Sequence, residues 1–438
     1  MKKVLIISYY FPPSGGPGVQ RVLKFVKYLP DFGWQPIVLT VEGGDFPARD
    51  ESLLSEIPSG TEVHRTKIFE PYRLYRKLTG KPAAAPVDVE NIPLADKNRS
   101  LVERLAGFVR ETFFIPDARI GWYPYAVPAA LAIAKEENID AIYSSSPPYS
   151  TSVIAREVHQ KTGLPWIAGF RDPWIGFISS PDRWFFPKKI DEYLERSVYE
   201  EANIVECAWR GIVKDFQSKY QHVNPLKCLH LPNGFDPDDY PPYEAEPHET
   251  FTVAYTGSMY GRRNPSTFLR AVEELVHEGA VDEKKIRLKF VGRFGAEVQS
   301  MFSATSLKNS TEVVSYVTHA ESILELLKAD CLLLVVDESK ESSEIVPGKV
   351  FEYIGAHRPI LALAEKGAIA EILEETKSGT AIPNNDVGAI KKAFVECYEN
   401  FVYHRKNFSP DEGKIKQYER REVTGRLAGL LDYLQNRR

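Results

Sequence analysis

VLIISYYFPPSGGPGVQRVLKFVKYLPDFGWQPIVLTV, residues 4–41, is the stretch that decides the fold, and its first part, VLIISYY, is an apolar run typical of a buried strand. A helix follows, because Val19, Val22, Leu23, Val26 and Leu29 recur at helical spacing. PIVLTV (36–41) then gives a second strand. A strand, a helix and a strand with short connections predict a βαβ unit, and therefore a parallel sheet.

The same alternation continues through the first half of the chain. A segment from about 66 to 123, rich in Arg, Pro and aromatic residues, interrupts it and is interpreted as an insertion. The further strands are expected at 141–145, 166–170, 203–208 and 227–232, with helices around 124–137, 150–162 and 189–202.

A linker dense in Pro and Asp, PNGFDPDDYPPYEAEP (232–247), precedes a second set of alternating elements. Strands are expected there at 251–257, 287–292, 312–317, 331–336 and 359–364. The chain ends in a predicted helix whose apolar stripe must be buried, formed by Val423, Leu427, Leu430, Leu431 and Leu434. We expect domains at 1–235 and 236–408 and a terminal helical segment at 409–438.

Composition excludes several classes of function. With 55 Lys and Arg against 60 Asp and Glu, the formal charge of -5 argues against nucleic acid as a partner. The four cysteines are scattered without CxxC spacing, which predicts buried thiols in a reducing compartment. Pro12 and Pro13 end the N-terminal apolar run, and no segment approaches about 20 apolar residues, so a cytoplasmic protein is expected. HExxH and GxSxG are absent, so neither a zinc site nor serine-hydrolase chemistry is expected.

Two glycine-rich loops follow predicted strands, where open α/β sheets hold their ligands. Gly15 and Gly16 lie in PPSGGPGVQR after the first strand, and glycine lets a backbone approach an anion closely. In AYTGSMYGRRNP, Gly257 precedes Arg262 and Arg263, whose guanidinium groups suit phosphate oxygens. The alternatives, a ligand-free Gly-Pro turn and a solvated arginine pair, stay open at this point.

ESSEIVPGKVFEYIGAHRPI (341–360) is the stretch most informative about function. Glu344 and Glu352 flank a loop in which Pro347 and Gly348 shape a turn and Lys349 adds a cation. The first amides of the following helix are free to hold an anion, and Glu352 can accept hydrogen bonds from sugar hydroxyls. Carboxylates at a helix start are otherwise dipole-stabilising charges.

Another strand-end loop, GFRDPWIGF (169–177), sets Arg171 beside Asp172 among aromatic residues. This pair is either functional or a structural ion pair. Asp236 and Asp238 mimic a metal-binding DxD, but their place in the linker favours turn chemistry.

Together these motifs resemble the family-4 retaining glycosyltransferases, and SSSPPYS with FRDPW resembles a bacterial surface-polysaccharide subgroup. The resemblance spans nearly the whole chain through the first Gly-rich loop, PNGFD, the TGS and VG loops, Glu-x7-Glu with EYIGAHRPI, and the terminal helix. It implies an α/β chain with two Rossmann-like domains facing across a cleft, the GT-B fold. The C-terminal helix is then expected to cross back to the N-terminal domain.

The resemblance also implies roles for individual residues. Arg263 falls at the phosphate-binding lysine of the family, whereas Ser258 stands where an arginine is usual, so Arg262 or Lys349 is expected to replace that cation. Arg171 and Asp172 stand where many relatives carry a His-Asp pair. The implied donor-binding residues are Gly16, Gly257, Ser258, Arg262, Arg263, Gly292, Val346, Pro347, Gly348, Lys349, Val350 and Glu352. The implied catalytic residues are Arg263, Lys349, Glu344 and Asp172, and the implied acceptor-side residues are Gly15, Arg171 and Asp172.

The implied reaction is metal-independent transfer of a hexosyl group, with retention, from a UDP- or GDP-sugar to a glycan or lipid-linked acceptor in cell-surface polysaccharide biosynthesis. No cofactor is expected. Basic and aromatic stretches in the insertion either rest on the inner face of the cell membrane or form a solvated face. The alternatives are a non-hydrolysing nucleotide-sugar epimerase and an inactive binding protein of the same fold.

Overall fold

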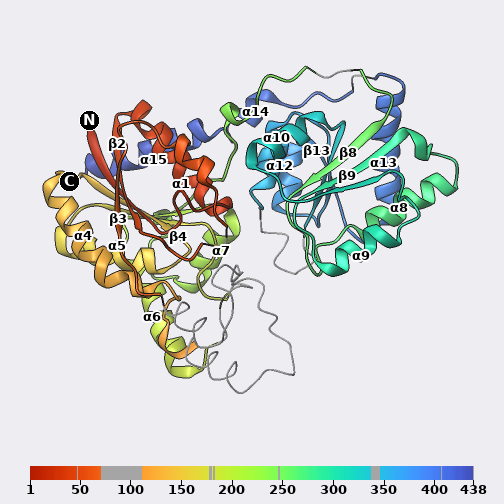
Figure 1. Cartoon of the computed structure of the whole chain (residues 1–438). Coiled ribbons are helices and arrows are strands. Elements are labelled where there is room, and N and C mark those ends of the chain that lie inside the picture. Colours follow the sequence, from red (N-terminus) through yellow and green to blue (C-terminus); the bar gives the residue numbers. More distant parts are fainter. Residues whose placement is uncertain are drawn as a thin grey trace. The chain divides into compact units, whose positions relative to one another are not determined.

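The computed structural model describes residues 1–46, 48–70, 111–176, 180, 183–244, 247–336, 346–405 and 407–437. It divides into two compact units: unit 1 is Met1–Pro232 with Val423–Arg438, and unit 2 is Asn233–Glu422. Each unit has one parallel sheet with helices packed against it (Figure 1). Most of the predicted insertion, residues 71–110, lies outside the described residues.

Unit 1 contains a seven-stranded sheet in the order β3-β2-β1-β4-β5-β6-β7. The strands are β1 (Lys2–Ser8), β2 (Trp34–Val41), β3 (Glu62–Thr66), β4 (Ala141–Ser146), β5 (Trp166–Phe170), β6 (Ile204–Cys207) and β7 (Cys228–His230). Its α-helices are α1 (Pro17–Tyr28), α4 (Tyr123–Glu136), α5 (Ser150–Thr162), α6 (Phe185–Glu201), α7 (Arg210–Lys219) and α15 (Arg420–Gln435). Chain order reverses between β1 and β4, and ligands of such sheets bind beside the carboxyl ends of the strands at the reversal.

Unit 2 repeats the arrangement with six strands in the order β10-β9-β8-β11-β12-β13. They are β8 (Phe251–Thr256), β9 (Ile286–Val291), β10 (Thr311–Val314), β11 (Cys331–Val335), β12 (Ile360–Leu363) and β13 (Gly379–Ile382). The α-helices are α8 (Ser266–His277), α9 (Ala296–Ala304), α10 (His319–Lys328), α11 (Lys349–Gly355), α12 (Ala368–Thr376), α13 (Val387–Val402) and α14 (Glu412–Lys416). The reversal here lies between β8 and β11.

The predicted α/β architecture with two parallel sheets is therefore confirmed, whereas two strands were missed. β3 has the sequence EVHRT and forms an edge of its sheet with half-buried side chains, so it lacks an apolar run. β13, GTAI, is a four-residue edge strand that begins with glycine. Neither strand has the continuous apolar run by which the other strands were recognised.

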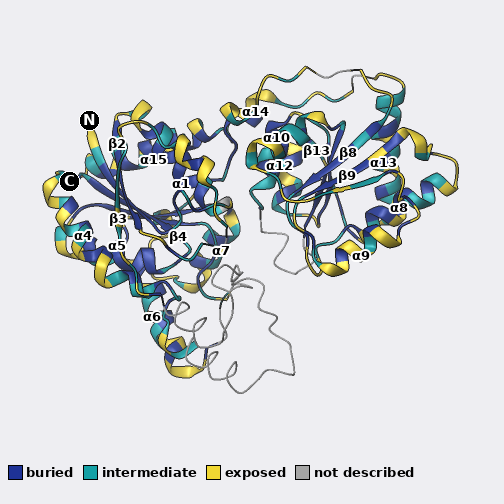
Figure 2. Cartoon of the chain, viewed as in Figure 1, coloured by how far each residue is buried: buried dark blue, intermediate teal, exposed yellow. Residues whose placement is uncertain are grey.

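The apolar stripe of the terminal helix is buried in unit 1. Val423, Leu427 and Leu431 of α15 belong to the same core cluster as Val22 and Val26 of α1, and the two helices lie side by side in Figure 1. Figure 2 shows the strands of both sheets as buried and the outer faces of the helices as exposed. The predicted terminal segment began at 409, but α14 belongs to unit 2 and the chain returns to unit 1 at Val423.

A buried ion pair fastens the last strands of unit 1 to α1. The Arg21 guanidinium pairs with Glu206 on β6 and donates to the carbonyls of Leu231 and Pro232, each at 2.8 Å. Tyr143 on β4 donates to the second oxygen of Glu206 at 3.0 Å. Burial raises the pKa of Glu206, while Arg21 and Tyr143 lower it. The polar groups of this core are thus matched inside the protein.

Arg21→Met is expected to lower the free energy of unfolding of unit 1 by about 3–5 kcal/mol, because Glu206 is left buried without its cation. Urea unfolding followed by tryptophan fluorescence measures this, since all six tryptophans lie in unit 1. The double variant Arg21→Met/Glu206→Met removes both charges and should lose less. A single variant as stable as the wild type would contradict the assignment.

Candidate functional site

Two glycine turns meet at the carboxyl edge of the second sheet. Gly257 follows β8 with φ +115° and Gly292 follows β9 with φ +145°, conformations that side chains rarely adopt. The Gly257 amide donates to the Val291 carbonyl at 2.7 Å. A Cβ on Gly292 would lie 1.9 Å from the carbonyl oxygen of Gly257. Only glycine permits this close approach of the two loops.

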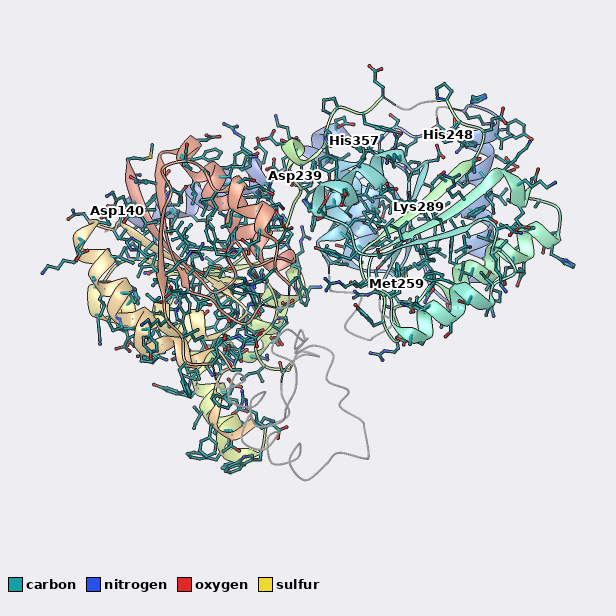
Figure 3. The ribbon with its side chains drawn as sticks, in the orientation of Figure 1. Asp140, Asp239, His248, Met259, Lys289 and His357 are labelled. Carbon is teal, nitrogen blue, oxygen red and sulfur yellow. The ribbon has the colours of Figure 1, made fainter. Side chains whose placement is uncertain are left out.

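Met259, labelled in Figure 3, connects the loop after β8 to the loop after β9 through backbone hydrogen bonds. Its amide donates to the Arg293 carbonyl at 3.1 Å, and its carbonyl accepts from the Gly295 amide at 3.0 Å. Its side chain is fully buried, which fixes the loop after β8 against the domain core. The backbone at the predicted donor edge is therefore held firmly before any ligand arrives.

Lys349, the first residue of α11, occupies the space above Gly257. A Cβ on Gly257 would lie 2.0 Å from Lys349 Nζ. The amine donates to the Tyr255 hydroxyl at 2.8 Å, and that hydroxyl donates to the Ser258 carbonyl at 2.8 Å. Burial and the nearby charge of Arg263 lower the pKa of Lys349 to about 7, although Glu352 raises it. An anion placed here would meet an amine ready to take up a proton.

Arg263 is the second cation of this group. It lies in the turn before α8, where its amide donates to the Tyr260 carbonyl at 3.1 Å. Its Nε atom is buried and has no hydrogen-bond partner within the described parts of the chain. The turn is held by Glu297 of α9, which accepts from the Gly261 amide at 2.7 Å. Arg262 beside it is exposed.

Glu352 lies one turn into α11, as predicted. Its Oε1 atom is 3.3 Å from His319 Nε2 at the start of α10, and its carbonyl accepts from the Tyr240 hydroxyl at 2.7 Å. Its side chain is half-buried, so one face remains accessible. Glu344 lies outside the described residues.

The turn between these glutamates leads into α11 through two hydrogen bonds. The Val350 amide donates to the Pro347 carbonyl at 3.1 Å, and the Phe351 amide donates to the Gly348 carbonyl at 3.1 Å. Val346 and Val350 are buried, whereas Pro347 and Gly348 are half-buried. Two valines thus anchor the turn and leave its tip at the surface.

The predicted acceptor-side loop of unit 1 is also well ordered by hydrogen bonds. Gly15 donates to the Ala48 carbonyl at 2.9 Å, and Gly16, with φ +95°, is the N-cap of α1. Arg171 donates to the Gly18 carbonyl at 2.9 Å, to Ser145 Oγ at 3.0 Å and to the Pro147 carbonyl. Its guanidinium therefore joins the first turn of α1 and the end of β4 to the loop that follows β5.

Asp172 adjoins this clamp. Burial raises the pKa of Asp172, and the neighbouring Arg171 charge lowers it. Its backbone carbonyl accepts from the Tyr149 hydroxyl at 3.4 Å. Arg171 therefore has a structural role. The carboxylate of Asp172 is partly desolvated by burial.

Asp236 and Asp238 form a turn, as predicted: the Asp236 carboxylate accepts from the Asp238 amide at 3.2 Å. Nowhere in the described ranges do three His, Cys, Asp or Glu side chains converge as metal ligands would. Likewise, none of the helices described is long and apolar enough to cross a membrane.

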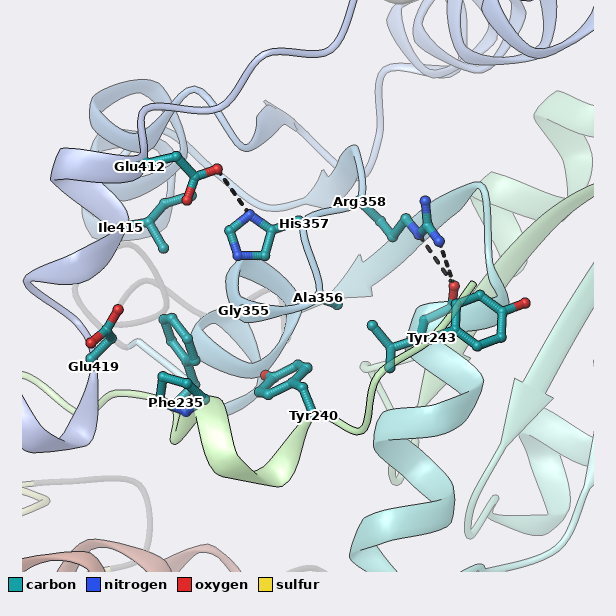
Figure 4. Close-up of a pocket in the computed structure, with 12 residues that line it drawn as sticks. Phe235, Tyr240, Tyr243, Gly355, Ala356, His357, Arg358, Glu412, Ile415 and Glu419 are labelled. Carbon is teal, nitrogen blue, oxygen red and sulfur yellow. Dashed lines mark hydrogen bonds and ion pairs between the residues drawn. The ribbon is translucent and has the colours of Figure 1, made fainter. Parts of the chain in front are cut away.

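A pocket of about 390 Å³ in unit 2 adjoins the C-terminal end of α11 (Figure 4). His357 Nδ1 lies 3.2 Å from Glu412 Oε1 at one wall, and Arg358 donates to the Leu327 carbonyl at 2.7 Å. Gly355 faces Phe235 and Tyr240 in it. The pocket contains none of the site residues predicted from the sequence, and the side chains of His357 and Arg358 already have partners.

Two residues that contact Lys349 or Glu352, Tyr255 and His319, were not predicted. Tyr255 precedes the TG turn at the end of a strand, so alternation alone placed it in the core and gave no sign of its hydroxyl contacts. His319 is a single histidine in a polar stretch, without a spacing that identifies it. Their contacts arise only when α10 and α11 are brought beside β8.

Residues 250–400 match a family model described as glycosyl transferases group 1, and no curated protein sequence matches the chain. HepE of Anabaena in complex with UDP-glucose is similar in structure, with TM-score 0.63, 14% identity, and coverage of 99% of this chain and 100% of that one. Sucrose-phosphate synthase from Thermosynechococcus elongatus has TM-score 0.65, 14% identity and 100% coverage of both. WaaG, a glycosyltransferase involved in lipopolysaccharide biosynthesis, has TM-score 0.58 and 14% identity, covering 98% and 99%. These likenesses establish the predicted fold class, two parallel-sheet α/β domains of the GT-B type.

Lys349→Met is expected to raise the melting temperature at pH 7, with a gain that shrinks towards pH 10. The folded pKa of Lys349, about 7, is below its ordinary value of 10.5, so the unfolded chain binds more protons between these pH values. This group therefore destabilises the fold most at and below pH 7, and the effect disappears above pH 10.5. Scanning calorimetry of both proteins across this range measures the difference.

The matched control is Lys392→Met on the exposed face of α13. This variant should show no such dependence on pH. A constant difference in melting temperature between Lys349→Met and the wild type at every pH would contradict the assigned environment of Lys349.

Proposed function

We propose that this protein is a retaining glycosyltransferase that transfers a hexosyl group from a nucleotide-sugar donor, a UDP- or GDP-sugar, to a glycan or lipid-linked acceptor. Its setting would be bacterial cell-surface polysaccharide biosynthesis in the cytoplasm, and the transfer would need no metal. The observation that carries the proposal is the position of Lys349 above Gly257, beside Arg263. Both cations lie in the part of the chain that matches the group 1 glycosyltransferase model.

In this proposal the diphosphate of the donor lies over the glycine turns. Lys349 would bind one phosphate and Arg263, with its buried Nε, the other. Ser258 stands where the family usually has an arginine, and in this proposal Lys349 replaces that missing cation. Arg262 is exposed at the surface. HepE with UDP-glucose bound offers a precedent for such a donor in this fold.

Glu352 would hold the ribose, because its half-buried carboxylate lies close to this edge and His319 fixes its orientation. Glu344 is proposed as a contact of the donor sugar. On the acceptor side, Gly15 and Asp172 would line the path of the incoming hydroxyl, and Arg171 would hold their loops in place.

During transfer the bond from the anomeric carbon to the diphosphate oxygen breaks, and a bond to the acceptor oxygen forms on the same face. Negative charge builds on the departing diphosphate oxygen, which takes up the proton that the acceptor hydroxyl gives up. Lys349 and Arg263 would stabilise this charge from fixed positions, so little reorganisation is needed during the reaction. Preorganised cations serve here where other enzymes use a metal ion.

The first test is a thermal-shift screen with UDP, GDP and ADP and their hexose derivatives. A nucleotide present at 100 times its dissociation constant stabilises the folded state by about 2.7 kcal/mol. One nucleoside diphosphate should raise the melting temperature, and its sugar should be consumed only with an acceptor. An epimerised sugar formed without acceptor would indicate the epimerase instead, and absence of any nucleotide binding would contradict both enzymes.

Arg263→Ala is expected to lower turnover by about 10²-fold or more, because a charge-stabilising donor is lost in the transition state. Glu352→Ala should mainly raise the KM for the donor, because its proposed contact exists before transfer. Steady-state kinetics with the donor identified above measures both. Arg270→Ala, at an exposed position of α8, is the matched control and should transfer normally. Near-normal transfer by both test variants would refute the assignment.

A further inference from the structure

The pocket at the end of α11 combines aromatic rings with polar groups (Figure 4). Three aromatic side chains line it, Phe235, Tyr240 and Tyr243. The rings of Phe235 and Tyr240 meet edge to face, with their centroids 5.8 Å apart. The volume of about 390 Å³ is in the range of small-molecule sites, which are also lined mainly by apolar and aromatic side chains.

Glycine lets two of these rings lie directly against α11. A Cβ on Gly355 would lie 2.5 Å from a ring carbon of Phe235 and 2.5 Å from the hydroxyl oxygen of Tyr240. That hydroxyl donates to the Glu352 carbonyl at 2.7 Å. His357, just beyond the helix, has φ +52°, which is uncommon for a residue with a side chain. The wall formed by the end of α11 is therefore fixed by close packing.

A carboxylate without a partner adjoins the rings. The Phe235 amide donates to the Tyr418 carbonyl at 3.0 Å, and the Phe235 carbonyl accepts from the Arg420 amide at 2.7 Å. Glu419 lies between those two residues and lines the pocket. Its carboxylate makes no hydrogen bond or ion pair with another described residue. Burial raises the pKa of Glu419, and Lys416 only partly offsets this. The carboxylate therefore has room for hydrogen bonds from a ligand.

Hydrogen-bond donors line the pocket as well. Arg358 donates to the Leu327 carbonyl through Nε at 3.2 Å and Nη2 at 2.7 Å, which leaves its Nη1 atom without a partner among the described residues. His357 Nδ1 lies 3.2 Å from Glu412 Oε1, which leaves Nε2. The hydroxyl of Tyr243 makes no hydrogen bond to another described residue. The pocket thus offers both donors and acceptors.

The charges of the lining select the kind of ligand. An anion would lie near the carboxylates of Glu412 and Glu419, and a cation would lie near the guanidinium of Arg358, so like charges oppose both. A neutral ligand with hydroxyl groups meets neither repulsion. It can donate to the carboxylates and accept from the guanidinium, while an apolar face packs on the rings. A sugar ring has both an apolar face and several hydroxyl groups.

We propose that this pocket is a binding site for a neutral mono- or disaccharide. Neither Lys349 nor Glu352 is among its lining residues, so the site is distinct from the proposed donor site. Binding of a free saccharide is measured without nucleotide and without transfer. Its outcome is therefore independent of the proposed enzymatic function.

Saturation-transfer difference NMR with the full-length protein tests the proposal, because it detects weak binding of small ligands. The probes are glucose, galactose, mannose, N-acetylglucosamine, maltose and lactose at millimolar concentrations. At least one should receive magnetisation from the protein. Glucosamine and glucuronate keep the ring of glucose but carry a positive and a negative charge, and both should bind more weakly than glucose.

Tyr243→Ala and Glu419→Ala should each weaken the affinity for the bound saccharide by about tenfold, because a ring surface or a hydrogen-bond acceptor is lost. The matched controls are Tyr403→Ala and Glu396→Ala, at exposed positions at the end and on the face of α13, and they should bind like the wild type. Lys349→Met should also bind the saccharide normally. Unchanged thermal unfolding shows that each variant is folded.

Four outcomes would overturn the proposal. The first is that none of the neutral probes gives a signal with the wild type, and the second is that a charged probe binds more tightly than glucose. The third is that the pocket variants bind as well as their controls. In the fourth, Lys349→Met alone abolishes the signal, which would place the saccharide at the proposed donor site.

Discussion

The close approach of the turns at Gly257 and Gly292 is the constraint on which the candidate site depends. A side chain at either position would overlap its neighbour, since a Cβ at Gly257 would lie 2.0 Å from the nearest atom and a Cβ at Gly292 would lie 1.9 Å from it. The missing side chain at Gly257 leaves room for the amine of Lys349, which α11 supplies from a distant part of the sequence. Backbone geometry at the ends of β8 and β9 thus decides where a cation of unit 2 is placed.

The cations of this protein fall into two groups according to how their charge is balanced. Arg21 is matched by Glu206 and two carbonyls, and Arg171 donates to α1, to β4 and to the residue after β4, so both stabilise the fold itself. Lys349 is different: burial and the charge of Arg263 lower its pKa to about 7, so its surroundings in the protein disfavour the charged amine. The negative charge of a bound diphosphate would instead favour the charged form of the Lys349 amine. Cations with partners inside the protein therefore stabilise the fold, whereas a buried cation with a lowered pKa is suited to bind an anionic ligand.

Sequence patterns predicted most of the fold, because strands buried in a parallel sheet read as short apolar runs. They failed at β3, whose EVHRT sequence faces partly outward, and at the short edge strand β13. The site was predicted in outline because carboxyl ends of parallel strands meet at one edge, which drew attention to Gly257, Arg263 and Lys349. The roles of Tyr255 and Arg171 depend on which side chains face each other across loops, and sequence order alone does not contain that information.

The measurement that tests the central claim most directly is the uptake of protons when UDP or GDP binds. Isothermal calorimetry at pH 8 in two buffers with different ionisation enthalpies gives this number for the wild type and for Lys349→Met. If Lys349 binds the diphosphate, the wild type takes up a substantial part of one proton at this pH, because its amine is mostly neutral before binding. The variant takes up correspondingly less. Equal proton uptake by both proteins, with equal affinity, would contradict the account.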